Sequence, residues 1–362
     1  MSPRIYGWPG DYHGCSWYRI ELPLQEMVRR GHQAQWHRNA TGEYETAMDE
    51  AEVLIGQRVC DPRASARWKC YAFAKHPKYR SWMERHGMND PALLRVWQRA
   101  QERPLKRLVF EVDDDLLNID PSSPVAHRFF SNPLIRKHLA DNLRAADTVV
   151  VTTEHLAEQM RAYNDDVRVV PNAIPSWLLE HERPRRDDGQ VTIGWAGSAT
   201  HAMDWATADD ELVRVLAKTR GRADLHVIGG LPEQWSRIPL HRRRITGWLD
   251  DVPSYYRALD FDIGIAPLAE HVFNRSKSPV KALEYGALGI PVVATDAGPY
   301  SEYVQHGVTG YLVRRPGDWV KYLRELVHDA DARAEMGAAG RRQAAEFTIE
   351  RIGAQWEAVL TG

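Results

Sequence analysis

The sequence predicts an α/β protein made of two Rossmann-like domains, each with a doubly wound parallel sheet. The first reason is length, because 362 residues are more than one hydrophobic core usually organises. The second is that short apolar or β-branched runs alternate with helix-like segments, which indicates parallel sheets. The third is a charged stretch rich in helix breakers, residues 181–189, after which the alternation starts again.

In the first half of the chain the alternation is regular except in one basic segment. We expect strands at residues 4–6, 34–36, 53–55, 108–112, 148–152 and 167–170, and helices at 17–28, 133–146 and 154–163. Gly31 follows the first of these helices as a C-cap. A turn-rich loop, residues 7–14, precedes that helix, and its glycines allow the backbone to approach a ligand closely.

Residues 58–107 interrupt the alternation with a basic segment that is rich in tryptophan. They hold 13 Lys/Arg against 4 Asp/Glu and include Trp68, Trp82 and Trp97. Their apolar periodicity is poor, and we expect two or three helices. The segment is either an ordinary solvated helical face or an electropositive surface for an anionic or polymeric acceptor.

The second half repeats the alternation and ends in helices. We expect strands at 191–195, 225–228, 261–266, 290–294 and 311–313, a strand that starts at 245, and helices at 209–218, 252–259, 279–288 and, among two C-terminal helices, 348–360. The expected domains are residues 1–175, which include the basic insert, and residues 176–345. Residues 346–362 form a C-terminal helix that is expected to pack back on the first domain.

Composition excludes several classes of protein. The formal net charge of −2 gives no global preference for nucleic acid or an anionic membrane. No run approaches the ~20 apolar residues of a membrane span, and no signal peptide is visible. Cys15, Cys60 and Cys70 are an odd number of cysteines without a metal-binding spacing. We therefore expect a reduced, cytoplasmic setting and no transmembrane segment.

The segment 274–295 has the pattern of an anion site next to a carboxylate. A polar loop carries Lys277, and a short helix follows with Lys281 and, one turn on, Glu284. Free N–H groups and the helix dipole favour anions at a helix N-terminus. A phosphate site beside a carboxylate suits a nucleotide, since the carboxylate can accept hydrogen bonds from ribose hydroxyls. The alternative is a surface helix with an ordinary Lys–Glu pair.

Three carboxylates, Asp113, Asp114 and Asp115, directly follow the strand at 108–112. Ligands bind at the carboxyl ends of strands in open parallel sheets, so we expect Asp113 and Asp114 to face a substrate. One alternative is helix N-capping by Asp114 or Asp115. Another is that Asp113 and Asp115 bind Mg²⁺ or Mn²⁺ on a diphosphate, as in a metal-dependent transferase.

Several motifs occur in the order and spacing of a known family. They are Glu111–Leu116, Ala146–Thr153, Val169–Asn172, Thr246–Asp250, Asp262–Pro267, Lys281–Val293 and Glu302–Gly310. With these motifs the chain resembles the GT-B glycosyltransferases, and more narrowly the group-4-like retaining branch in its bacterial and phage subset. The resemblance covers most of the chain. It implies a GT-B fold, in which two Rossmann-like domains face each other across a cleft.

The resemblance implies transfer of a sugar from a UDP-, GDP- or dTDP-sugar to an acceptor hydroxyl, with retention and without a required metal. Glu284 matches the family glutamate that holds the ribose. Ser276 stands where the family has a second glutamate against the sugar, so Asn274, Arg275 and Ser276 are expected to take over that contact. Mg²⁺ or Mn²⁺ is not favoured.

The loop 197–204 lacks the arginine and lysine that the family usually has there. We expect Lys277 and Lys281 to supply that charge. The remaining expected site residues are Gly197, Ser198, Thr200 and Glu302 for the donor, Gly14 and Arg19 near the donor sugar or the acceptor, and Asp113, Asp114 and Lys277 as catalytic groups.

The acceptor is left open by the sequence. It is either a glycan or, through the basic segment 58–107, modified DNA or a virion protein. Two other functions of the same fold are a sugar-nucleotide epimerase and a non-catalytic sugar-nucleotide-binding protein.

Overall fold

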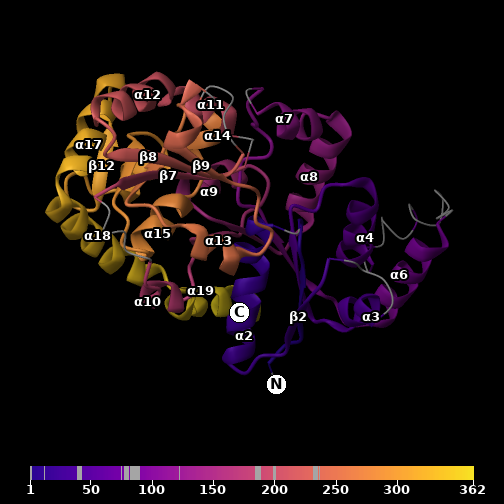
Figure 1. Cartoon of the computed structure of the whole chain (residues 1–362). Coiled ribbons are helices and arrows are strands. Elements are labelled where there is room, and N and C mark those ends of the chain that lie inside the picture. Colours follow the sequence, from indigo (N-terminus) through magenta and orange to yellow (C-terminus); the bar gives the residue numbers. More distant parts are fainter. Residues whose placement is uncertain are drawn as a thin grey trace. The chain divides into compact units, whose positions relative to one another are not determined.

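The chain forms two compact units in a computed structural model. The model describes residues 2–11, 13–38, 43–74, 76, 81, 90–121, 123–183, 189–198, 201–230, 235 and 237–362. Unit 1 comprises Met1–Leu117, Arg128–Pro171 and Ile352–Gly362, and unit 2 comprises Asn118–His127 and Asn172–Arg351. In Figure 1, indigo to magenta marks most of unit 1, and orange marks much of unit 2.

The first half of the chain alternates between strands and helices, as expected. Its elements are β1 (Ile5–Trp8), α1 (Gly14–Ser16), the π-helix η1 (Trp17–Glu21), α2 (Leu22–Arg29), β2 (Ala34–Trp36), α3 (Glu43–Glu50), β3 (Val53–Gln57), α4 (Pro62–Phe73), α6 (Pro91–Glu102), β4 (Arg107–Glu111), α7 (Pro124–Phe130), α8 (Pro133–Ala145), β5 (Thr148–Val151), α9 (Glu154–Met160) and β6 (Val167–Val169). Three of the helices begin at an Asp-Pro or Asn-Pro pair, in which Asp61, Asp90 or Asn132 accepts a main-chain N–H of the first turn.

The second half repeats the pattern. Its elements are α10 (Trp177–Glu180), β7 (Val191–Gly197), α11 (Ala202–Ala206), α12 (Asp209–Lys218), β8 (Ala223–Gly229), η4 (Leu240–Arg242), β9 (Arg243–Thr246), α13 (Val252–Ala258), β10 (Ile263–Ala266), α14 (Val272–Arg275), α15 (Val280–Ala287), β11 (Val292–Thr295), α16 (Pro299–Tyr303), β12 (Gly310–Val313), α17 (Pro316–His328), α18 (Ala330–Ala344), η5 (Ala345–Phe347) and α19 (Ile349–Thr361).

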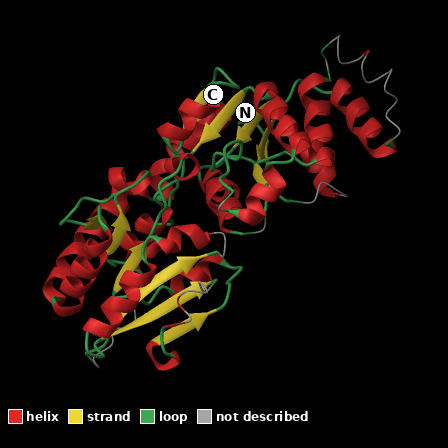
Figure 2. Cartoon of the chain, turned by 90° about the horizontal axis from the view of Figure 1, so that it is seen from above, coloured by secondary structure: helices red, strands yellow, loops and turns green. Residues whose placement is uncertain are grey.

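Each unit contains a parallel six-stranded sheet. The strand order is β2-β1-β3-β4-β5-β6 in unit 1 and β12-β11-β10-β7-β8-β9 in unit 2. Every residue of β3, β5 and β10 is buried, which fits strands covered by helices on both faces. Figure 2 shows the strands in yellow among these helices in red. The direction of winding reverses between β1 and β3 in unit 1, and between β7 and β10 in unit 2. The prediction of two Rossmann-like α/β domains is confirmed.

The end of α19 belongs to unit 1. Ile352, Trp356 and Val359 are buried on one side of this helix. Glu357 accepts a hydrogen bond at 3.0 Å from Arg30, the residue that follows α2, and Figure 1 shows the C-terminus beside α2.

Three details differ from the expected elements. The C-terminal region contains three helices instead of two, because Asp329 ends α17 and caps α18 by accepting the N–H of Ala332 at 2.8 Å. The expected polar loop before α15 contains the short helix α14, which His271 caps. The expected helix at 17–28 contains a π-helical turn that brings Arg19 into the interior.

Candidate functional site

Small residues hold helix α15 tightly against its neighbours in unit 2. Tyr285 packs on Gly264 of β10, where an added Cβ would lie 2.3 Å from the Tyr285 ring. On another side, a Cβ at Gly286 would lie 3.0 Å from the main-chain oxygen of Gly340 in α18. These close contacts fix the position of α15 and of its charged residues.

Glu284 of α15 is a buried carboxylate with only 3% of its surface exposed. Its Oε2 accepts a hydrogen bond at 2.7 Å from the hydroxyl of Tyr255 in α13. Burial, together with the Glu284 carboxylate, raises the pKa of Tyr255 well above its usual value, so the phenol keeps its proton. The arrangement holds Glu284 as an oriented acceptor of hydrogen bonds.

A hydrogen-bonded network joins α15 to the loop after β7 and to α14. The Oδ1 of Asp204 accepts from the side chain of Asn274 at 2.7 Å and from the main-chain N–H of Ala269 at 2.9 Å. Its Oδ2 lies 2.6 Å from Nδ1 of His201, and Nε2 of His201 lies 3.3 Å from Nζ of Lys281. The network positions Lys281 through His201.

The charges in this network are set by burial and by its own hydrogen bonds. Burial and the nearby Lys281 lower the pKa of His201 to about 4, so the imidazole is neutral at pH 7. Burial opposes ionisation of Asp204, but hydrogen bonds from His201 and Ala269 hold the pKa of this carboxyl below its usual value. A proton on Nδ1 donated to Asp204 leaves Nε2 as the acceptor for the Lys281 ammonium.

Two paired glycines allow close contacts at the ends of β7 and β8. Gly197 is the last residue of β7, where the sequence predicted a loop. A Cβ at this position would lie 2.7 Å from Trp195 and 3.3 Å from Cε of Lys281. Its partner on β8, Gly229, has a φ of +96°, and a Cβ there would lie 2.1 Å from the carbonyl oxygen of Gly197.

These groups lie at the point of unit 2 where a parallel sheet is expected to bind its ligand. Gly197 ends β7 and His201 follows it, and Ala269 follows β10, the neighbouring strand on the other side of the reversal. Crevices at the carboxyl ends of strands that wind in opposite directions are the usual ligand sites of such sheets. The lysine, the neutral imidazole and the carboxylate network therefore converge on a suitable place for an anionic ligand.

The other expected residues of segment 274–277 differ in burial and in their hydrogen-bond or ion-pair partners. Asn274 uses both amide hydrogens within the protein, on Asp204 and on the carbonyl of Ala269, so only its amide oxygen could contact a sugar. Ser276 is fully buried. Arg275 is exposed and pairs with Glu270 at 3.1 Å.

The remaining expected donor residues come from several segments of unit 2. Nζ of Lys277 lies 4.5 Å from the ring centroid of Phe273, one turn earlier on the chain. Glu302 is exposed on α16. Ser198 follows β7 directly, and Thr200 lies outside the described residues.

In unit 1, Asp113 and Asp114 surround one arginine that the sequence did not single out. Arg58 follows β3, has a φ of +51° and forms ion pairs with both carboxylates, that with Asp114 at 3.4 Å. It also donates to Sγ of Cys15 at 3.3 Å. A non-glycine residue in this conformation is held by its surroundings, here by the carboxylates at the end of β4.

The acidic residues that follow β4 in unit 1 differ in their surroundings. Asp115 is fully buried, whereas Asp113 pairs with the guanidinium of Arg58. Among the described residues, no group of three or more His, Cys, Asp or Glu side chains could hold a metal ion.

Arg19 corrects an expectation of the sequence. Its side chain is completely buried and donates at 2.7 Å to Glu111 and at 2.7 Å to the carbonyl of Val170. Its guanidinium also lies 4.8 Å from the ring centroid of Trp356. It therefore stabilises the interior of unit 1 and does not face a ligand. Gly14 begins α1 in open space, and a Cβ there would meet its nearest neighbour only at 4.0 Å.

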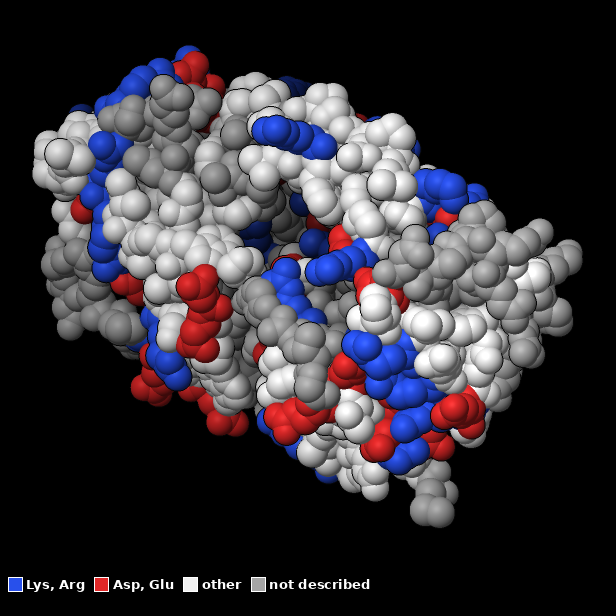
Figure 3. Space-filling model, turned by 90° about the vertical axis from the view of Figure 1, so that its right-hand side faces the viewer, with Lys and Arg blue, Asp and Glu red and all other residues white. Residues whose placement is uncertain are grey.

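The basic segment 58–107 has less unbalanced charge than its composition indicates. Arg99 pairs with Glu45 at 2.7 Å, and Arg67 lies 3.5 Å from the same carboxylate. Lys69 pairs with Asp141 at 2.9 Å. On the face shown in Figure 3, basic and acidic side chains are intermixed. These pairs reduce the positive field that a polyanion would meet.

The aromatic residues of the same segment are mostly core residues where they are described. Trp68 has no exposed surface, and Trp97 is 5% exposed. Trp82 lies outside the described residues.

In the described part of the chain, no helix is long and apolar enough to cross a membrane.

The comparison with protein families identifies the domain that holds this network. Residues 190–329 match the model of the family described as "Glycosyl transferases group 1". A curated relative from Stackebrandtia nassauensis, a D-inositol 3-phosphate glycosyltransferase, is 29% identical over 238 residues, which are 56% of this chain and 51% of that protein. A relative of the same name from Salinispora tropica is 32% identical over 166 residues, 43% of this chain and 32% of that protein. The chain thus spans about half the length of these relatives or less.

Solved structures match almost the whole chain. The Anabaena protein Alr3699/HepE, in complex with UDP and glucose, has a TM-score of 0.63 at 15% identity, with 99% of each chain covered. A glycosyltransferase from Rickettsia africae has a TM-score of 0.60 at 14% identity, with 98% of this chain and 97% of that chain covered. At these identities the likeness shows the fold. The chain therefore has the fold of the GT-B glycosyltransferases, and its residues 190–329 match the group 1 glycosyltransferase family model.

Proposed function

We propose that this protein transfers a sugar from a nucleotide-sugar donor to an acceptor hydroxyl. The observation that carries the proposal is the pair of charged residues on α15, the buried carboxylate Glu284 and the positioned ammonium of Lys281. Both lie inside the domain that matches the group 1 family. A buried carboxylate one turn from a cation is the arrangement that a ribose with its diphosphate requires.

Each charged group has a chemical role in this proposal. Glu284 accepts hydrogen bonds from the ribose hydroxyls, since an ionised carboxylate is an acceptor only. Lys281 and Lys277 neutralise the diphosphate as negative charge develops on it. One well-placed donor of this kind is worth about 3 kcal/mol of barrier in a site that excludes water. Asp113, Asp114 and Arg58 of unit 1 are proposed to act near the acceptor hydroxyl.

The proposed reaction retains the anomeric configuration and needs no metal. The bond between the sugar C1 and the phosphate oxygen breaks, and its electron pair goes to the diphosphate. The acceptor oxygen bonds to C1 on the face that the diphosphate leaves, and its proton passes to the departing phosphate. The support for this course is the resemblance to retaining transferases and the pairing of Asp113 with Arg58.

UDP-sugars are the first donors to test, because the structural relatives of this chain include complexes with UDP and UDP-glucose. GDP- and dTDP-sugars are the alternatives. The acceptor is a glycan, modified DNA or a protein. The curated relatives are named for inositol 3-phosphate, so a small phosphorylated polyol is a further candidate acceptor.

A thermal-shift panel tests the donor assignment. A nucleotide at about 100 times its Kd should raise the unfolding free energy by roughly 2.7 kcal/mol. We expect UDP or UDP-glucose to shift the melting temperature of the wild type, and the Glu284→Gln variant to lose most of this shift. The control is Glu335→Gln, a change of an exposed carboxylate on α18 of the same unit.

Two outcomes would contradict the proposal. One is the absence of any shift with UDP, GDP, dTDP and their sugars. The other is an epimerised sugar nucleotide when the donor is supplied alone, which would identify an epimerase. Transfer of the sugar to an added acceptor, followed by NMR of the new linkage, reports whether the configuration is retained.

A further inference from the structure

Unit 1 has a pocket of its own at the point where its sheet reverses direction. Trp8 ends β1 and Gln57 ends β3, the two strands between which the winding reverses. Both residues line a pocket of ≈ 610 Å³, a volume typical of small-molecule sites. Its position in unit 1 corresponds to the usual ligand site of an open parallel sheet.

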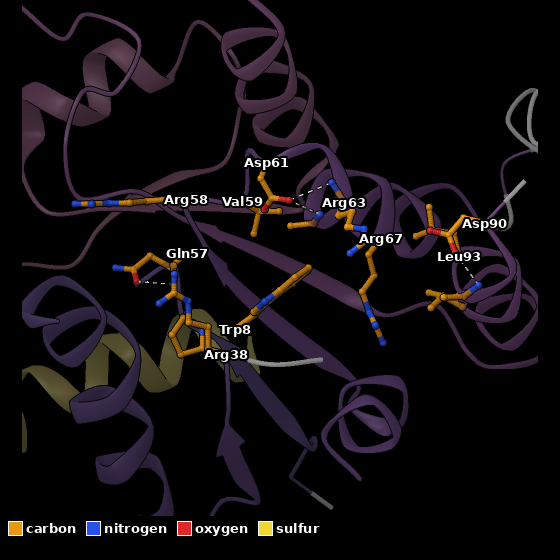
Figure 4. Close-up of a pocket in the computed structure, with 15 residues that line it drawn as sticks. Trp8, Arg38, Gln57, Arg58, Val59, Asp61, Arg63, Arg67, Asp90 and Leu93 are labelled. Carbon is orange, nitrogen blue, oxygen red and sulfur yellow. Dashed lines mark hydrogen bonds between the residues drawn. The ribbon is translucent and has the colours of Figure 1, made fainter. Parts of the chain in front are cut away.

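The walls of this pocket combine an aromatic side chain with polar and basic ones. Figure 4 shows Trp8 in the middle, Arg38 and Gln57 on one side of it, and Arg63 and Arg67 on the other. An indole beside hydrogen-bonding side chains suits a saccharide or polyol, which has an apolar C–H face and polar edges.

Some charged side chains of the pocket already have partners within the protein. Arg67 lies near Glu45 and Asp49, so its charge is balanced. The two acidic residues of the lining, Asp61 and Asp90, serve as helix N-caps with their oxygens on main-chain N–H groups.

The guanidinium of Arg63, by contrast, has no acidic partner among the described residues. Its side chain is exposed at the first turn of α4. Arg38 adds a second basic side chain from the other side of the pocket. Arginine matches the oxygens of a phosphate through two parallel hydrogen bonds. The pocket therefore favours an anionic group next to a sugar-like body.

We propose that this pocket binds an acceptor that carries a phosphoryl group, a phosphorylated saccharide or polyol, with Arg63 and Arg38 on the phosphoryl oxygens. Calling this ligand the acceptor rests on the proposed transferase function. The binding itself rests only on unit 1. The phosphoryl group comes from a soluble sugar phosphate or from a lipid-linked one, and the same arginines serve both.

The test measures binding by calorimetry at fixed ionic strength. The soluble probes are glucose 6-phosphate, mannose 6-phosphate, glycerol 3-phosphate and myo-inositol 1-phosphate, each beside its unphosphorylated parent. The lipid probe is phosphatidylcholine vesicles with and without phosphatidylinositol, whose headgroup is a polyol phosphate. We expect at least one phosphorylated probe to bind ten times more tightly than its parent, and Arg63→Gln or Arg38→Gln to reduce that affinity about tenfold. The matched control is Arg95→Gln, which removes an exposed arginine of α6 outside the pocket lining.

Each outcome decides the proposal. Binding of soluble probes only, or of vesicles only, supports it and identifies the source of the phosphoryl group. It is overturned if no probe shows a dependence on the phosphoryl group, if Arg95→Gln weakens binding as much as Arg63→Gln, or if only an oligonucleotide competes. The UDP-induced shift of the same samples reports on unit 2. Its loss with the pocket binding intact would count against the transferase function and not against the pocket.

Discussion

Removal of the His201 imidazole should destabilise unit 2 in a way that depends on pH. The His201→Ala substitution deletes the hydrogen bond at 2.6 Å to Asp204, a carboxylate that is only 5% exposed. A hydrogen bond to a charged group contributes about 1.5–3 kcal/mol. We expect the variant to lose about 2 kcal/mol of unfolding free energy at pH 7. Lys281 also loses its contact with Nε2, so sugar transfer should slow.

The pH dependence follows from the lowered pKa of His201. The folded protein keeps the imidazole neutral down to a pKa of about 4, against the usual value of 6.5. His201 has a lower pKa in the folded protein than in the unfolded chain, so its contribution to stability is fully present above the unfolded-state pKa. This contribution is lost as the pH falls from about 6.5 to about 4. The difference corresponds to roughly 3 kcal/mol. The alanine variant lacks this loss, so the gap between the two proteins should close as the pH approaches 4.

Urea unfolding followed by tryptophan fluorescence measures both effects. The ring centroids of Trp195 and Trp205 lie 4.8 Å apart in the core of unit 2, so their fluorescence reports on the unfolding of this unit. The control is His241→Ala, which changes an exposed histidine of η4 and should stay within about 0.5 kcal/mol of the wild type. A loss below about 0.5 kcal/mol for His201→Ala at pH 7, or a gap that stays constant from pH 7 to pH 4.5, would refute this reasoning.

Three further changes test other parts of the structure. Arg19→Met leaves Glu111 buried without its partner and should lower the free energy of unfolding in urea by about 3–5 kcal/mol. Adding Glu111→Leu should recover most of this loss. An Arg19→Met variant as stable as the wild type would contradict the buried pair. Gly197→Ala places a Cβ 2.7 Å from a Trp195 ring atom, so it should cost about 1–3 kcal/mol and slow transfer by displacing Lys281; unchanged melting and turnover would argue against this close contact. Asp61→Ala removes the N-cap of α4 and should lower the unfolding free energy by about 1 kcal/mol, while Asp61→Asn should retain most of it, and equal losses in both would point to charge instead of capping.

Much of the fold could be predicted because strands and helices leave local patterns in the sequence. β2 was expected at residues 34–36 and is Ala34–Trp36, and α12 was expected at 209–218 and is Asp209–Lys218. The breaks between helices were harder to predict. One aspartate, Asp329, separates α17 from α18, and the sequence around it continues the helical pattern.

The site could be predicted only in part, for a related reason. Lys281 and Glu284 lie one turn apart on α15, so helix geometry alone brings them together. The role of Asn274 could not be predicted, because its partner Asp204 is 70 residues away and local sequence patterns do not show which distant segments meet. Arg58 was counted only as one basic residue of its segment, although it joins the two carboxylates at the end of β4.

The sequence alone determined the class of fold, the alternation of its elements and the helix that carries Lys281 and Glu284. These depend on periodicity and on caps, which act over a few residues. Only the tertiary structure decided which charged groups are buried and which partners they pair with. Arg19 was expected near the donor sugar or the acceptor, but it pairs in the core with Glu111, 92 residues away. Which side chains are buried, and which partners they pair with, depends on how distant strands pack. Neither can be predicted from the identity of a single residue.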